Sequence, residues 1–172
     1  FRVTKDQTDK DLSIQDVYSE LVQDELRNQL IAEDVFTCHT EGRHCLVLTE
    51  RTAHVDLLTK MISARIPNVI ALKGGLGTKE TTALLKQLTA TPTNEQLTIV
   101  ATGKFIGEGF DEARLDTLFL AMPISWKGTL QQYAGRLHRL CEHKKEVRVY
   151  DYVDVRVRML EKMYNKRLNG YA

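Results

Sequence analysis

The chain has 172 residues, of which 42% are hydrophobic, and a chain of this length and composition can bury the core of one domain. Its formal net charge is only +1, so no global basic field marks it as a nucleic-acid-binding protein. The sequence contains no run of about 18 apolar residues, which argues against a membrane-spanning helix.

Residues 1–12 are polar and show no hydrophobic period, so we interpret them as a linker that precedes a domain at 13–172. The chain does not begin with methionine, and we expect it to be a domain of a longer protein. It has no charged and apolar leader, and its three cysteines follow no paired pattern. Both observations favour a reducing, cytoplasmic location.

The segment 13–38 has the spacing of one long leading helix. Ser13 is a suitable N-cap, and Asp16 favours the first turn. Apolar residues then recur at helical spacing: Ile14, Val17, Tyr18, Leu21, Val22, Leu26, Leu30, Ile31 and Val35. We expect this helix to pack against a sheet.

Short apolar runs alternate with helical patterns along the rest of the chain. The predicted strands are 43–49, 68–72, 97–102, 117–122 and 147–152, and the predicted helices are 53–65, 78–89, 131–139 and 154–168. This alternation predicts an α/β protein with a three-layer α/β/α fold, a mainly parallel sheet and right-handed crossovers. The carboxyl ends of parallel strands share one edge, and ligands bind at that edge.

A glycine-rich loop follows the predicted strand at 97–102. It begins at Gly103, crowds three glycines into a few residues, and ends on an acid at Gly109-Phe110-Asp111. An acid held at a glycine turn can accept hydrogen bonds from hydroxyl groups. A local turn cap is the alternative role of Asp111.

One face of the helix predicted at 131–139 carries polar and basic side chains. Gln132, Arg136 and Arg139 stand at i, i+4 and i+7, so their side chains project from one side. Gly135 lies beside this column and has no Cβ, which lets a backbone or a phosphate come close. Two guanidiniums one turn apart suit phosphate oxygens better than a single carboxylate. Ordinary surface arginines on a solvated helix face are the alternative.

These two stretches resemble motifs V and VI of the C-terminal RecA-like domain of superfamily-two helicases, a P-loop NTPase fold that lacks the Walker A motif. The loop ending Gly109-Phe110-Asp111 is similar to motif V, and Gln132-x-x-Gly135-Arg136-x-x-Arg139 is similar to motif VI. The resemblance runs from about Arg43 to the C-terminus and is greatest to bacterial DEAD/DEAH-type proteins related to restriction-enzyme and repair helicases. Gly107 departs from the pattern, because family members often have arginine there.

The resemblance implies a role for each motif residue. Gln132, Arg136 and Arg139 would be catalytic, with the two arginines acting as arginine fingers. Three further residues would face the nucleotide: Gly109, Asp111 and Gly135. Six would contact the nucleic-acid backbone, at strand ends or in the loops that follow them: Thr49, Arg51, Lys73, Gly74, Thr102 and Lys104. For Thr49, a strand-ending threonine that starts a turn is the alternative.

The sequence lacks the parts that hold ATP. The loop that begins Lys73-Gly74-Gly75 does not have Walker A spacing, and no Asp-Glu metal-binding box occurs. We therefore expect ATP with Mg²⁺ to bind mainly on an N-terminal RecA-like domain of the same parent chain, and the isolated domain to be inactive. The expected partner is nucleic acid, and DNA is expected from the resemblance alone.

Two alternatives remain open from the residues themselves. A metal site is one interpretation of several histidines and cysteines, namely the pairs Cys38-His39 and His44-Cys45 and the group His138, Cys141 and His143. None of them has the paired C-x-x-C geometry of a closed zinc site, so we expect no metal. The alternative function is a catalytically idle nucleic-acid-binding or protein-docking module that kept the fold alone.

Overall fold

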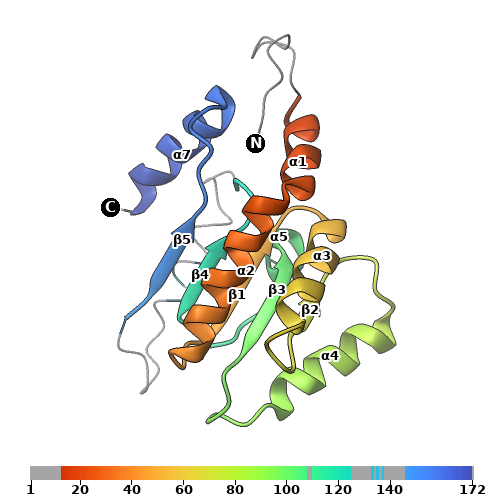
Figure 1. Cartoon of the computed structure of the whole chain (residues 1–172). Coiled ribbons are helices and arrows are strands. Elements are labelled where there is room, and N and C mark those ends of the chain that lie inside the picture. Colours follow the sequence, from red (N-terminus) through yellow and green to blue (C-terminus); the bar gives the residue numbers. More distant parts are fainter. Residues whose placement is uncertain are drawn as a thin grey trace.

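The computed structural model describes residues 13–107, 110–124, 133, 135, 137 and 146–171. In this part of the chain, five strands form one sheet in the order β2-β3-β1-β4-β5, and every neighbouring pair is parallel (Figure 1). The strands are β1 (Cys45–Thr49), β2 (Ile70–Leu72), β3 (Thr98–Thr102), β4 (Thr117–Leu120) and β5 (Arg148–Asp151).

Helices pack on both faces of this sheet. One face carries α2 (Glu25–Thr40) and α3 (Thr52–Ser63), and the other carries α4 (Thr78–Ala90) and α5 (Gly103–Gly107). Two further helices, α1 (Ile14–Gln23) and α7 (Arg158–Tyr171), lie beyond the carboxyl ends of the strands (Figure 1). The predicted three-layer α/β/α fold with a parallel sheet is confirmed.

Strand β1 shows why these apolar runs form central strands. All five of its residues are buried, with Leu46 and Leu48 in the core on the α4 side and Cys45 and Val47 in the core on the α2 side. A parallel strand covered on both faces has apolar residues throughout, because neither face meets water. A third cluster joins α1 and α7 at the carboxyl edge: Val17, Leu21, Met122, Val157 and Leu160.

The prediction of one continuous helix at 13–38 is wrong, because the chain breaks at Asp24. The backbone of Asp24 is extended, with φ −72° and ψ 94°, and its carboxylate accepts the Arg27 N–H at 3.0 Å, which caps α2. The Asn28 side chain donates to the Val22 carbonyl at 2.8 Å and satisfies the end of α1. The break also turns the apolar stripe, so that Leu26 and Leu30 are exposed.

Local hydrogen bonds determine where helices α1 and α7 begin. Ser13 is the N-cap of α1, as predicted: its hydroxyl accepts the Asp16 N–H, and the Asp16 carboxylate accepts the Ser13 N–H. The last helix begins at Arg158 and not at Asp154, because Asp154 forms a turn in which its carbonyl accepts the Val157 N–H at 3.2 Å. No helix in the ranges given above is long and apolar enough to cross a membrane.

Candidate functional site

The loops that follow β1 and β3 begin side by side at the carboxyl edge. Thr49 and Thr102 are register partners, so Glu50 and Gly103 are the first residues beyond the two strands. A Cβ added to Gly103 would lie 2.9 Å from the Glu50 Oε1, which means that the carboxylate packs directly against the glycine. A side chain at this position would require the end of the flexible Glu50 side chain to shift.

The helix predicted at 131–139 is anchored to the same point. Tyr133 and Leu137 are buried in the core on the α4 side, and the Tyr133 hydroxyl donates to the Gly103 carbonyl. Gly135 is exposed, and nothing lies within 4 Å of the place where its Cβ would be. Tyr133 and Leu137 therefore anchor this part of the chain to the core. Gln132, Arg136, Arg139 and Gly109 lie outside the described residues, so their assigned roles stay predictions.

Thr49 is the end of a buried hydrogen-bond chain. The Asn28 amide group donates to Val22, so its Oδ1 must accept from His54 Nε2 at 2.8 Å. His54 Nδ1 is then the unprotonated nitrogen, and it accepts the Thr49 hydroxyl at 2.8 Å. The Thr49 side chain is fully buried, so its hydroxyl serves the fold in this structure and does not reach a surface where a phosphate could bind.

This chain makes stability depend on the protonation of His54. Burial, helped by the charge of Arg27, lowers the pKa of His54 from 6.5 to about 4. The unfolded chain therefore takes up a proton first as the pH falls, and stability is lost between about pH 6.5 and about pH 4. We expect a loss of about 2 kcal/mol between pH 7 and pH 4.5, measured by urea unfolding.

The variant His54→Gln is the control for this pH dependence, because it removes the titrating ring. Its free energy of unfolding should fall less steeply over the same pH range than that of the wild type. A residual slope is expected, since burial also lowers the pKa of His39 and His44. Equal slopes in wild type and variant would show that His54 is not neutral in the fold.

The basic residues predicted to contact nucleic acid are distributed along this edge. Arg51 is half-buried beside α1, where its guanidinium donates to Gln15 Oε1 and lies 5.8 Å from the Tyr18 ring centroid. Lys104 is exposed one residue after Gly103. Arg51 follows β1 and Lys104 lies in α5 directly after β3, so both residues lie beyond the carboxyl ends of neighbouring strands. Thr102 is 7% exposed and offers little surface.

The loop after β2 lies on the other side of β3. The Lys73 ammonium is paired with the Asp56 carboxylate of α3, so a phosphate there would compete with an existing ion pair. Gly74 is exposed, and nothing lies within 4 Å of the place of its Cβ. Gly75 has φ +85°, a backbone conformation that favours glycine, and this explains the second glycine of the turn.

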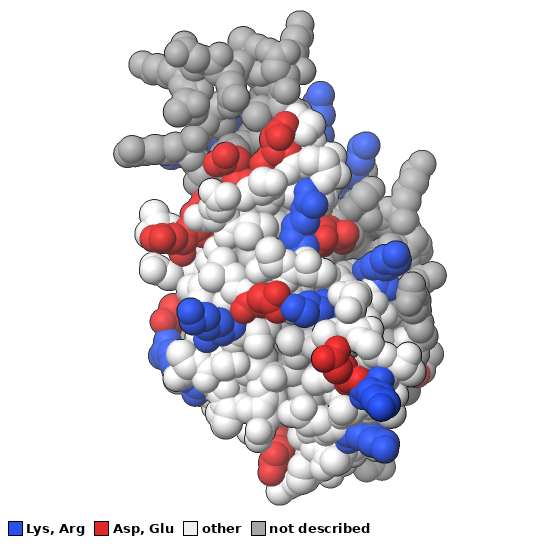
Figure 2. Space-filling model, turned by 90° about the vertical axis from the view of Figure 1, so that its right-hand side faces the viewer, with Lys and Arg blue, Asp and Glu red and all other residues white. Residues whose placement is uncertain are grey.

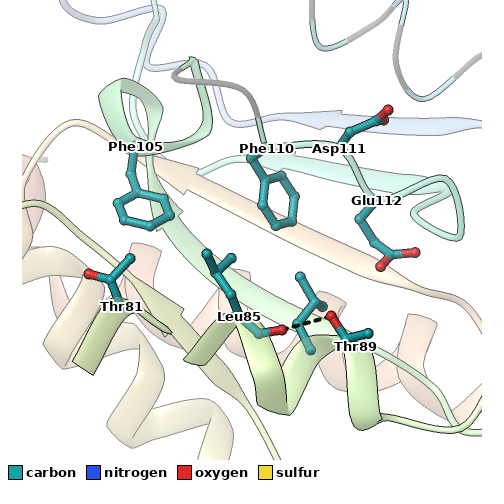
Figure 3. Close-up of a pocket in the computed structure, with 8 residues that line it drawn as sticks. Thr81, Leu85, Thr89, Phe105, Phe110, Asp111 and Glu112 are labelled. Carbon is teal, nitrogen blue, oxygen red and sulfur yellow. Dashed lines mark hydrogen bonds between the residues drawn. The ribbon is translucent and has the colours of Figure 1, made fainter. Parts of the chain in front are cut away.

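A groove of about 460 Å³ separates α4 from the loop that follows α5. Figure 3 shows Phe105 and Phe110 pointing down toward Leu85 of α4, while the Asp111 carboxylate points away from both rings. Leu88 is the one residue of α4 that is buried. The described residues that line the groove include no lysine or arginine, so it suits an apolar group better than a phosphate. Asp111 is exposed at its edge.

Among the histidines and cysteines that invited a metal-site interpretation, those of the two pairs have structural partners, whereas His138, Cys141 and His143 lie outside the described residues. His44 Nδ1 accepts the Leu97 N–H at 3.0 Å, and His39 Nδ1 lies 3.2 Å from the Thr98 hydroxyl. Cys38 and Cys45 are buried and free, and Cys38 Sγ lies 3.3 Å from the Tyr150 hydroxyl. Within the described ranges, no three histidine, cysteine, aspartate or glutamate side chains form a group that could hold a metal ion.

Charge is mixed over the side of the molecule on which α3 and α4 lie. Figure 2 shows acidic and basic side chains interspersed on this face, with uncharged surface between them. Such a surface has no field of one sign to attract a phosphate backbone. The carboxyl edge, where Arg51 and Lys104 lie, is therefore the better candidate for an anionic partner.

Comparison with known proteins shows the fold. No family model matches the chain, and no curated protein matches its sequence. The structure is similar to T4 UvsW, with a TM-score of 0.65, 21% identity, and coverage of 85% of this chain and 29% of that one. It is also similar to the C-terminal part of the Fun30 ATPase domain, with a TM-score of 0.65, 16% identity, and coverage of 80% and 43%.

These similarities confirm the RecA-like α/β/α fold. The chain spans less than half the length of each similar structure, so it corresponds to one part of a larger assembly of domains in both. At these identities the likeness concerns the arrangement of strands and helices and not the individual site residues.

Proposed function

We propose that this chain is the second motor domain of an ATP-dependent nucleic-acid helicase or translocase. One observation carries the proposal: the bond from the Tyr133 hydroxyl to the Gly103 carbonyl joins the helix at 131–139 to the start of the glycine-rich loop. The two stretches that resemble helicase motifs are thereby brought together at the carboxyl edge, where ligands bind in sheets of this kind. The resemblance supports a bacterial DEAD/DEAH-type parent related to restriction or repair helicases, acting on DNA.

In this proposal, ATP with Mg²⁺ is bound mainly by an N-terminal RecA-like domain of the same parent chain. The described residues fit a secondary role: Asp111 is exposed, and Gly135 leaves open space, so both can border a nucleotide held elsewhere. Arg136 and Arg139 would complete the site when the two domains close, because guanidiniums stabilise charge on a transferring phosphoryl group. The cycle of closure and release would move the nucleic-acid contacts of one domain relative to those of the other.

The isolated chain should not hydrolyse ATP, even with saturating single-stranded DNA, because it lacks a phosphate cradle and a magnesium ligand. The measurement is phosphate release by purified chain, with the parent protein as the positive control. Turnover by the isolated chain that disappears in its Arg139→Ala variant would contradict the division of the site between two domains. A parent protein that binds DNA without any ATPase activity would favour the idle binding module.

The isolated chain should bind single-stranded DNA weakly and with a shallow salt dependence, through Arg51 and Lys104. Each phosphate contact adds about 0.7 to the slope of log K against log salt, so Arg51→Ala and Lys104→Ala should each reduce the slope by about that amount. Lys86→Ala is the matched control, because Lys86 is exposed on α4, away from the carboxyl edge. Equal losses of slope in all three variants would mean that binding follows overall charge and not this edge.

A further inference from the structure

Helix α7 presents a column of basic side chains to solvent. Its inner face is fixed by Leu160, which is buried in the cluster shared with α1, and by Arg167, which is bonded to the Asp151 carboxylate. Three exposed basic residues stand at i, i+4 and i+8, away from that inner face: Arg158, Lys162 and Lys166. The packing of α7 therefore holds the column in a fixed position on the domain, with its charged groups in water.

The column has no counter-charge in the part of the chain that the structure describes. None of its three basic side chains forms an ion pair with a described carboxylate, and Glu161, beside the column, is the one acidic residue of α7. By contrast, Lys73 is paired with Asp56, and Arg65 is paired with Glu33. An unpaired column of one sign attracts an anionic partner.

The column lies at the same edge of the sheet as the nucleic-acid contacts proposed above. Helix α7 stands beyond the carboxyl end of β5, whereas Arg51 and Lys104 lie beyond the carboxyl ends of β1 and β3 (Figure 1). In the strand order, β3 and β5 are three inter-strand spacings apart, which is about 14 Å. The column is thus a separate surface, to one side of those contacts.

We propose that α7 binds the phosphate backbone of duplex DNA that adjoins the single strand held at Arg51 and Lys104. The inference rests on the proposed function and adds a second surface, for the double-stranded part of the substrate. The spacing of the column suits a duplex, because successive members rise by about 6 Å along the helix and form a fixed array of charges. A duplex presents its phosphates at regular positions, so a fixed array can meet them without ordering a flexible strand.

The side chains around the column also suit a backbone better than unpaired bases. Proteins that bind single strands stack bases on aromatic rings. Tyr164 lies between Lys162 and Lys166 in the sequence, but it is half-buried, and the Arg167 guanidinium lies 5.8 Å from its ring centroid. Two exposed amides, those of Asn165 and Asn169, accompany the column and can donate to phosphate oxygens.

The double variant Lys162→Gln with Lys166→Gln tests the inference. The probes are a DNA single strand and the same strand with an adjoining duplex, each titrated with the chain at several salt concentrations. For the probe with the duplex, the slope of log K against log salt should fall by about 1.8, because each lost duplex contact removes about 0.9. The slope for the single strand alone should stay unchanged, whereas Arg51→Ala should lower the slope for both probes.

The double variant Lys60→Gln with Lys86→Gln is the matched control. It removes the same charge from exposed sites on α3 and α4, and it should leave both slopes unchanged. All four lysines are exposed, so both double variants should melt like the wild type. Equal losses of slope in the two double variants would overturn the inference, because binding would then follow overall charge. An unchanged duplex slope in the α7 variant, or an equal loss for the single strand, would overturn it too.

The proposed function and the inference can fail separately. If the parent has DNA-stimulated ATPase activity that Arg139→Ala abolishes, but the α7 variant binds the duplex like the wild type, the function stands and the inference fails. If the parent has no such activity and the slopes change as expected, the motor function fails and α7 is the duplex-binding surface of a binding module.

Discussion

Replacement of Arg139 by alanine is expected to lower the DNA-stimulated ATP turnover of the parent protein by about 10³-fold or more. The reason is that an arginine finger donates to the phosphoryl oxygens mainly when the cleft between the domains closes, so its contribution appears in the transition state. ATP affinity should change far less than turnover, because the other domain supplies most nucleotide contacts. The measurement is steady-state ATPase activity with saturating single-stranded DNA.

Two controls separate this catalytic role from a structural one. Arg139→Lys should recover little activity, since a point charge cannot reproduce the planar fork of donors. A thermal melt of each variant should match the wild type, because the loss expected is one of chemistry and not of folding. A variant that melts early would show that Arg139 holds the fold, and one that turns over like the wild type would show that it is not a finger.

Replacement of Arg167 by methionine is expected to destabilise the chain by about 3 to 5 kcal/mol. Arg167 is 1% exposed and forms two parallel bonds of 2.7 Å from Nε and Nη2 to the Asp151 carboxylate, which joins α7 to the end of β5. Removing it leaves a carboxylate with 10% exposure next to an apolar side chain. Thermal unfolding should shift down by about 10 °C for a domain of this size.

The double variant Arg167→Met with Asp151→Leu tests the cause of that loss. Removing both charges should recover part of the stability, because the cost arises from a buried carboxylate that has lost its two Arg167 donors more than from the loss of the pair itself. Arg148→Met is the matched control: Arg148 also makes two hydrogen bonds to carboxylates, those of Glu146 and Glu41, but its side chain is 39% exposed. Solvent screens this pair, so Arg148→Met should change stability far less. Equal losses in both single variants would contradict the assignment.

The sheet could be predicted from the sequence because its strands are continuous apolar runs. Residues 45–49 and 98–102 are buried on both faces, and burial of that kind favours apolar residues at consecutive positions within each strand. The break at Asp24 was missed because the apolar period continues across it through Leu26 and Leu30. The cap that ends α1 depends on Asn28, whose amide group acts through tertiary contacts that spacing does not reveal.

The candidate site was predictable only where it has a local signature. Glycine and arginine spacing identified the loop after β3 and the helix at 131–139, since these motifs are short and contiguous. The burial of Thr49 depends on His54, five residues away on α3, and the role of Gly103 depends on Glu50 and Tyr133. Contacts between residues that are distant in sequence leave no pattern for periodicity to detect.

Helix α4 is attached to the sheet by few buried side chains. One buried leucine, Leu88, and the groove beside Phe105 and Phe110 leave it with few apolar contacts to lose when it lifts from the sheet. The sheet beneath it is held independently, by β1 and by the helices on the opposite face. Local unfolding of α4 should therefore cost less free energy than unfolding of the sheet, so this flank of the domain can open while the carboxyl edge keeps its geometry.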